Sequence, residues 1–227
     1  MKSLLVVTTI LLCFTNAIAQ SSKKTYPLTT SQGLQSVHVM IQPTTYNSKK
    51  GIQVKDTTKA NSTEVMYAKL TDLQFTNGII EVELSGRPLT TARETARGFV
   101  GIAFRISEDD SRFECIYLRP ANGRAEDQVQ RNHSVQYISF PNYPWEKLRK
   151  ETPGQYEAYV DLEVGKWTKV KIEVAGSTAR LFVHGATQPT LIVSDLKHGA
   201  DSKGNIGLWI GPGTDAYFRN LTVTINN

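Results

Sequence analysis

The sequence predicts an all-β protein, a sandwich of two antiparallel sheets, on three observations. From residue 34 onward apolar and polar side chains alternate with a period of two, as they do in strands that bury one face. Turn signals such as Asn77-Gly78 and Gly176-Ser177 separate these short runs at spacings typical of a sandwich. No segment keeps a helical period for more than about two turns.

The first half of the chain supplies strands of unequal clarity. Ile79 to Leu84 alternates apolar residues with Glu81 and Glu83, which we expect to face outward. The one segment that favours a short helix is 88–97, which holds two alanines and a glutamate. The candidate strands of this half are residues 34–41, 51–54, 65–70, 79–84, 99–106 and 112–119.

The second half continues the alternating pattern. Three segments of the chain are longer than connectors need to be, namely 86–97, 120–133 and 141–156. Long ordered loops on a rigid sandwich are where binding and catalytic residues usually lie. The candidate strands of this half are residues 135–140, 156–162, 167–174, 179–183, 190–194, 205–210 and 217–225.

Residues 1–19 fit a cleavable signal peptide. Lys2 gives a short positive region, and an apolar stretch follows that is too short to span a bilayer as a helix. Ala17-Ile18-Ala19 fits the small-x-small cleavage pattern. We therefore expect an exported protein, periplasmic or extracellular, with a flexible segment at 20–33 that has room for an edge strand at its end, and one domain over 34–227.

The cysteines constrain how this domain is stabilised. Cys13 lies in the apolar stretch and would be removed with the signal peptide, which leaves Cys115 alone. No intramolecular disulfide can then form, so the exported domain must be stabilised by its core.

The charge of the chain is mildly positive and evenly spread. Its 26 basic and 21 acidic residues give a net charge of +5 and form no long basic block. The composition therefore predicts neither nucleic acid nor an anionic membrane as a partner, and no second apolar stretch is long enough for a membrane span. The oligomeric state is left open.

Two segments of the C-terminal half resemble a known fold. They are KWTKVKIEVAGSTARLFVHG (166–185) and GNIGLWIGPGTDAYFRNLTV (204–223). Their order, a strand opening with Trp, a hairpin, G-x-I-G-L and F-R-N-L-x-V, resembles concanavalin A-like jelly rolls, which include laminin G-like domains, lectins and glucanases. GFVGIAFR (98–105) followed by FECIYLR (113–119) is most similar to the bacterial 3-keto-disaccharide hydrolase-like domain family. The resemblance implies an exported jelly roll that binds or processes sugars.

The hairpin within residues 99–119 offers the first candidate site. If its turn spans 107–112, Arg105 lies opposite or nearly opposite Glu114 and both project from the outer face of the sheet. In jelly-roll lectins and glucanases that face is the sugar cleft, and of the family's Glu, Gln and closing Asp this hairpin keeps Glu114 and has Arg119 in place of the Asp. Glu114 is therefore the candidate catalytic residue, and Arg105 and Arg119 are candidates for substrate binding. The alternative is a cross-strand ion pair on a solvated face.

The segment 122–133 is the densest polar stretch of the chain. Sugars need planar donors and acceptors for their hydroxyl pairs and aromatic faces for their C–H surfaces. The alternative is a solvated loop whose charges pair among themselves. The substrate-binding candidates in and after this segment are Arg124, Gln128, Arg131, Tyr137 and Trp145.

Candidates for catalysis are few. Hydrolysis by paired carboxylates needs two acids about 5 to 10 Å apart, and Glu114 with Asp127 or Glu126 is the pair that the sequence nominates. His133 is a candidate general base with Asp127 nearby in sequence. No His or Cys spacing fits a metal, no cofactor is required, and calcium at Asp109-Asp110 is the one ion left open.

Three functions therefore remain open. The first is a carbohydrate-binding module, the second a glycoside hydrolase of the 3-keto-disaccharide type, and the third a laminin G-like domain that binds a protein. Whether the protein is an enzyme is not decided by any motif in the chain.

Overall fold

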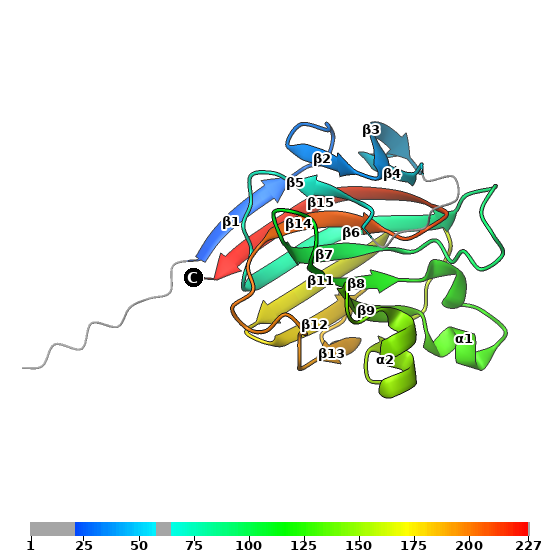
Figure 1. The fold of residues 1–227 in the computed structure, drawn as a ribbon. Helices are drawn as coiled ribbons and strands as arrows, with labels where there is room; N and C mark the ends of the chain where they lie inside the picture. Colours follow the sequence, from blue (N-terminus) through cyan, green and yellow to red (C-terminus); the bar gives the residue numbers. More distant parts are fainter. Residues whose placement is uncertain (1–20, 58–64, 227) are drawn as a thin grey trace, which may run out of the picture.

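The protein is the jelly-roll sandwich of two antiparallel sheets that the sequence predicts (Figure 1). This computed structural model describes residues 21–57 and 65–226, so the signal peptide predicted at 1–19 lies outside the described residues. The elements in chain order are β1 Ser21–Tyr26, β2 Leu34–Val37, β3 Val39–Tyr46, β4 Lys49–Asp56, β5 Tyr67–Leu70, β6 Gly78–Pro88, β7 Val100–Ile106, β8 Phe113–Leu118, η1 Pro120–Asn122, α1 Gln128–Asn132, β9 Val135–Phe140, α2 Trp145–Glu151, β10 Glu157–Ala158, β11 Thr168–Ala175, β12 Thr178–Val183, β13 Leu191–Val193, β14 Asn205–Ile210 and β15 Thr214–Asn226.

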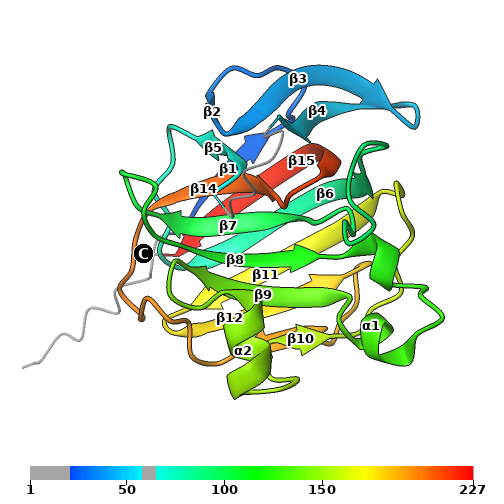
Figure 2. The ribbon, with the colours of Figure 1, turned by 45° about the vertical axis from the view of Figure 1, so that its right-hand side comes forward.

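The two sheets form the two layers of the sandwich (Figure 2). The eight-stranded back sheet has the order β13-β12-β11-β6-β15-β4-β3, and β1 also pairs with β15. The seven-stranded front sheet has the order β10-β9-β8-β7-β14-β5-β2. Neighbouring strands thus come from distant parts of the sequence, since β6 lies between β11 and β15, and β14 lies between β7 and β5.

The core fills the space between the sheets, as the alternating pattern predicts. On β11, Val170, Ile172 and Val174 are buried while the residues between them are exposed or half-buried. On β7, Ile102 and Phe104 are fully buried in the same apolar cluster. Burying one face of each sheet in this way supplies the main favourable free energy of folding.

The N-terminal polar segment contains a strand rather than only a flexible tether. Ser21–Tyr26 pairs with β15 along its whole length, from Ser21 opposite Asn226 to Tyr26 opposite Leu221. Its side chains are almost all exposed, so the strand is held by backbone hydrogen bonds, which need no apolar side chains. That is why the hydrophobic pattern predicts it only weakly.

The helix favoured at 88–97 does not form. Residues 89–99 form turns and irregular backbone, and Leu89 N donates at 2.8 Å to Gly213 O, which extends the β6–β15 pairing, so tertiary pairing overrides the helical propensity. Short helices form instead in the next two long loops. Asp127 caps α1 by accepting from Gln130 N, and α2 places Glu146 in its first turn, where the helix dipole favours an acid.

The β7–β8 hairpin forms with Glu114 close to Arg105, as predicted, but the predicted face is wrong. Glu114 lies opposite Phe104, not opposite Arg105. A β-bulge sets Phe104 and Arg105 against Ile206 alone, and Arg105 takes a positive φ of 55°. The bulge breaks the alternation, and neither Arg105 nor Glu114 lies on the outer face, since they are only 1 % and 0 % exposed.

Arg105 instead joins three loops at one end of the sandwich. Its Nε and Nη2 donate to Thr76 O at 3.0 and 2.9 Å, and Nη2 also donates to Gly176 O at 2.8 Å. Nη1 donates to Gly199 O at 2.8 Å, and Ala200 O lies 3.2 Å from Nη2. A buried guanidinium is tolerated because backbone carbonyls bind it on several sides.

Glu114 points into the interior and holds the same end of the fold. Its Oε2 accepts from Tyr137 Oη at 2.6 Å, and its Oε1 accepts from the backbone N of His198 at 2.9 Å. Tyr137 is also fully buried, so burial raises the pKa of its phenol, with Glu114 acting in the same direction. Tyr137 and Glu114 are therefore not surface groups that meet a sugar.

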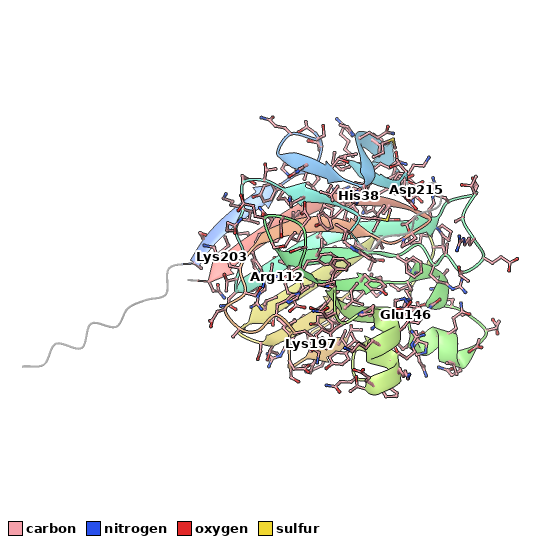
Figure 3. The ribbon with its side chains drawn as sticks, viewed as in Figure 1. His38, Arg112, Glu146, Lys197, Lys203 and Asp215 are labelled. Atoms are coloured by element: carbon pink, nitrogen blue, oxygen red, sulfur yellow. The ribbon has the colours of Figure 1, made fainter. Side chains whose placement is uncertain are left out.

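We expect Arg105→Met to lower the free energy of unfolding by about 3 kcal/mol or more, because it leaves several buried carbonyls without a donor. Urea denaturation measures the loss. The matched control is Arg112→Met in the exposed β7–β8 turn (Arg112 is labelled in Figure 3), which should change stability by less than about 0.5 kcal/mol. Equal effects of the two substitutions would contradict the role given to Arg105.

Candidate functional site

The outer face of the front sheet carries an aromatic row, which we define as Phe99, Tyr117 and Trp209. The Tyr117 ring lies 4.7 Å from that of Trp209 and 6.1 Å from that of Phe99, centroid to centroid. The row depends on Gly101, which is opposite Tyr117 on the neighbouring strand. A Cβ at residue 101 would lie 2.5 Å from Tyr117 Cβ, so only glycine allows this approach.

Arg119 lies at one end of the aromatic row, directly after β8. It is only 4 % exposed. Its Nη2 donates to Tyr117 Oη at 3.0 Å and to Gln136 Oε1 at 3.1 Å, and its Nη1 donates to His133 O at 3.1 Å. The guanidinium therefore ties β8 to β9 on their outer faces.

Glu157 on β10 gathers the basic groups around Arg119. Arg149 Nε donates to both of its carboxylate oxygens at 2.9 and 3.1 Å, and Arg149 Nη2 also contacts Oε1. Arg119 Nη1 lies 3.5 Å from Oε1, and His133 Nδ1 lies 2.9 Å from Oε2. We call these residues the arginine–glutamate cluster: Arg119, His133, Gln136, Arg149 and Glu157.

Trp145 connects the cluster to the molecular surface. It begins α2, and Arg149 follows one turn later on the same side of the helix. The Arg149 guanidinium lies 4.6 Å from the indole centroid, and the Arg119 guanidinium lies 5.6 Å from it. Two cation–π contacts thus fix a half-buried indole beside the cluster. Figure 3 labels Glu146, which marks this end of α2.

The two arginines of the cluster influence the pKa of His133. Burial lowers the pKa of His133 below its ordinary value, and although Glu157 opposes this, Arg149 and Arg119 act in the same direction as burial. The imidazole is therefore neutral at neutral pH, with one nitrogen able to accept a proton.

The structure brings together three of the site residues that the sequence nominates: Arg119, His133 and Trp145. The others serve different contacts around the polar loop. Their placements are Arg124 paired with Asp161 and Glu163, Gln128 bonded to Asn132, Arg131 beside the Tyr159 ring, and Asp127 capping α1.

The nominated carboxylate pair is not brought to one cleft. Glu114 faces the interior of the sandwich, whereas the Asp127 carboxylate accepts from Gln130 N at 2.9 Å at the start of α1. His133 contacts Glu157 rather than Asp127. The carboxylate of the site is Glu157, which sequence reasoning missed because its partners lie far away in the chain.

Sequence reasoning also missed Gln136 and Arg149. Gln136 is a polar residue at an outward position of β9, and the spacing of Trp145 and Arg149 places them on one helix face once α2 is known. Both signals are present in the sequence, but neither distinguishes a site from an ordinary solvated surface.

The Asp109-Asp110 turn is occupied by protein donors. Asp109 Oδ1 accepts from the hydroxyls of Ser107 and Ser111 at 2.7 Å, and Asp110 Oδ1 lies 2.7 Å from Lys69 Nζ. Over 21–57 and 65–226 no group of three His, Cys, Asp or Glu residues is arranged to hold a metal ion. Calcium binding at this turn stays a prediction. Within the same described ranges, no helix is long and apolar enough to cross a membrane.

We expect His133 to make stability depend on pH. Because its pKa is lower in the folded state, the unfolded chain binds more protons as the pH falls through about 6.5, so protonation favours unfolding. On acidification from about pH 7.5 to about pH 5, the free energy of unfolding should therefore fall less for His133→Gln than for wild type. Urea denaturation at both pH values checks this. The control is exposed His184→Asn, and equal pH slopes for wild type and His133→Gln would contradict the expectation.

Comparison with known proteins supports the fold. No protein-family model matches the sequence, and a search of curated proteins finds no match. Solved structures that resemble this one include the carbohydrate-binding module CBM66 from Bacillus subtilis, with a TM-score of 0.55 and 14 % identity over 84 % of this chain and 95 % of that one.

Two further structures give the same result. A protein of unknown function with a galectin-like fold from Bacillus subtilis has a TM-score of 0.53 and 12 % identity, covering 90 % of this chain and 96 % of that one. The Crh5 transglycosylase in complex with NAG has a TM-score of 0.54 and 15 % identity, covering 95 % and 88 %. At these identities the likeness shows the jelly-roll fold that the sequence predicts, and the nearer resemblance to the 3-keto-disaccharide hydrolase-like family stays a prediction.

Proposed function

We propose that this domain binds carbohydrate on the outer face of its front sheet, where the arginine–glutamate cluster meets Trp145. The observation that carries the proposal is a half-buried indole contacted by two guanidinium groups, both of which also contact the buried carboxylate of Glu157. Aromatic faces combined with planar, fixed donors are the chemistry that sugar rings require.

Each part of the cluster supplies something that sugar binding needs. The half-buried Trp145 ring offers a flat apolar face for the C–H surface of a sugar ring. Arg149, whose side chain is 32 % exposed, offers donors to a pair of hydroxyls. Glu157 holds Arg149 in place before the ligand arrives, which reduces the entropy lost on binding.

The fold neighbours support this function by their names. One is a carbohydrate-binding module, and another is a transglycosylase in complex with NAG. The predicted signal peptide at 1–19 supports export, and we include export to the periplasm or the outside of the cell in the proposal, because glycans are abundant there.

We expect Arg149→Lys to weaken glycan binding about tenfold or more, because lysine keeps the charge but loses the planar fork that contacts both Glu157 and Trp145. A glycan array identifies the ligand, and isothermal titration measures its Kd. Lys150→Ala, at the exposed next position of α2, is the matched control and should bind like wild type. Unchanged affinity of Arg149→Lys for every glycan that wild type binds would refute this site.

Glycoside cleavage is a second candidate function, and the contact between His133 Nδ1 and Glu157 Oε2 at 2.9 Å favours it. Such a pair can pass a proton to or from a reacting group. If the domain cleaves its ligand, His133→Gln should abolish turnover while changing Kd less than about threefold. Reducing-end release from the array-identified glycan measures turnover, and binding without turnover by wild type would leave binding as the sole function.

A further inference from the structure

The outer face of the back sheet, on the opposite side of the sandwich, is hollowed. A depression of about 360 Å³ lies over β6, β11 and β12 and is bordered by Gly185 and Ala186 in the loop after β12. This volume is within the range of about 300 to 1,000 Å³ that is usual for small-ligand sites. We call it the back-sheet hollow.

The floor of the back-sheet hollow is a ladder of opposite charges. Lys169 lies opposite Glu83, and Lys171 lies opposite Glu81, across β11 and β6. These four residues line the hollow with two acidic and two basic groups, and their outer partners are also of both signs, since Lys49 and Arg219 approach Glu83 and Glu173 pairs with Lys171 at 2.7 Å. A floor of this kind favours a neutral ligand with many hydroxyls over an anion or a cation, since either charge would meet as much repulsion as attraction.

Part of this ladder is held in a fixed geometry. Glu83 accepts from Asn220 Nδ2 at 3.0 Å and lies 3.2 Å from Lys49 Nζ. Partial burial alone would raise the pKa of Glu83, but the hydrogen bonds from Asn220 and Lys49 lower it below its ordinary value. The carboxylate therefore stays ionised and positioned as an acceptor.

Aromatic rings flank the ladder at both ends. Phe182 lines the hollow, and Lys171 Nζ lies 4.0 Å from its ring centroid. At the other end, Lys49 and Arg219 both contact Glu83 and both lie about 6 Å from the Trp167 ring centroid.

The aromatic surface continues beyond Trp167. Trp167 Nε1 donates to Tyr46 O at 3.2 Å, and the Tyr46 ring stacks on Tyr217 with centroids 3.7 Å apart and planes 7° apart. Arg87 lies over both tyrosine rings and binds Asp215, which Figure 3 labels on this side of the molecule. Charged and aromatic side chains thus continue from the hollow along the outer side of the back sheet, although Tyr217 and Asp215 are almost fully buried.

We infer that the back-sheet hollow is a second carbohydrate site, which takes a neutral oligosaccharide. Glu81, Glu83, Lys169 and Lys171 bind its hydroxyls, while the Phe182 ring, which is 7 % exposed and covered by Lys171 Nζ, positions that ammonium group. The inference does not rest on the front-sheet site, because none of its residues belongs to the arginine–glutamate cluster. If both sites are occupied, one domain joins two glycan chains, and avidity exceeds the affinity of either site.

The experiment isolates the hollow by using the Arg149→Lys background. The probes are a panel of neutral di- to tetrasaccharides and an oligogalacturonate of matched length, titrated by calorimetry. The added substitutions are Glu81→Ala with Lys169→Ala, which remove two exposed floor groups without changing net charge. Lys50→Ala, an exposed lysine on β4 of the same sheet, is the matched control.

We expect a neutral oligosaccharide to bind the Arg149→Lys protein, the floor double substitution to weaken it about tenfold or more, and Lys50→Ala to leave it unchanged. The oligogalacturonate should bind at least about tenfold more weakly. Unchanged affinity after the floor substitutions, or no binding of any neutral probe to Arg149→Lys, would overturn the inference. If Arg149→Lys alone abolishes binding, and the floor substitutions in the wild-type protein do not weaken it, the front-sheet site is the binding site and the hollow binds no sugar.

Discussion

The fold depends on one buried cation and the backbone carbonyls that surround it. Arg105 joins the β5–β6 loop, the β11–β12 turn and the loop before β14, so it fastens the back sheet to the front sheet at one end. The same loop before β14 gives the His198 amide to Glu114, which in turn binds Tyr137 on β9. The other face of β9 carries Gln136 of the arginine–glutamate cluster. One strand, β9, thus contributes side chains both to the interior network and to the outer cluster.

The fold and most strands could be predicted from the sequence, because burial of one strand face makes apolar and polar residues alternate with a period of two. The faces on which Arg105 and Glu114 lie could not be predicted in this way. The bulge at Arg105 requires a positive φ at a residue that is not glycine, and no residue pattern announces this conformation. Strand β1 was predicted only weakly because backbone hydrogen bonds, not apolar side chains, hold it.

The candidate site was predictable in part. Arg119, His133 and Trp145 stood out as polar or aromatic residues next to long loops. Glu157 did not, because its role arises from Arg119, His133 and Arg149, which meet it only when β8, β9, α2 and β10 converge. The two faces that result differ in chemistry. The front face is a mostly covered aromatic row ending in excess positive charge, while the back face is an open ladder of balanced charges.

The pairing of β1 with β15 constrains the time course of folding as well as the architecture. Strand β15 is the last of the chain, yet it is flanked by β6 and β4 and joined by β1, whose residues come from the opposite end of the sequence. Contacts of such high sequence separation carry a large loop-closure entropy and form slowly. The back sheet therefore cannot close before β15 has been synthesised, because β1, β4 and β6 all pair with that strand.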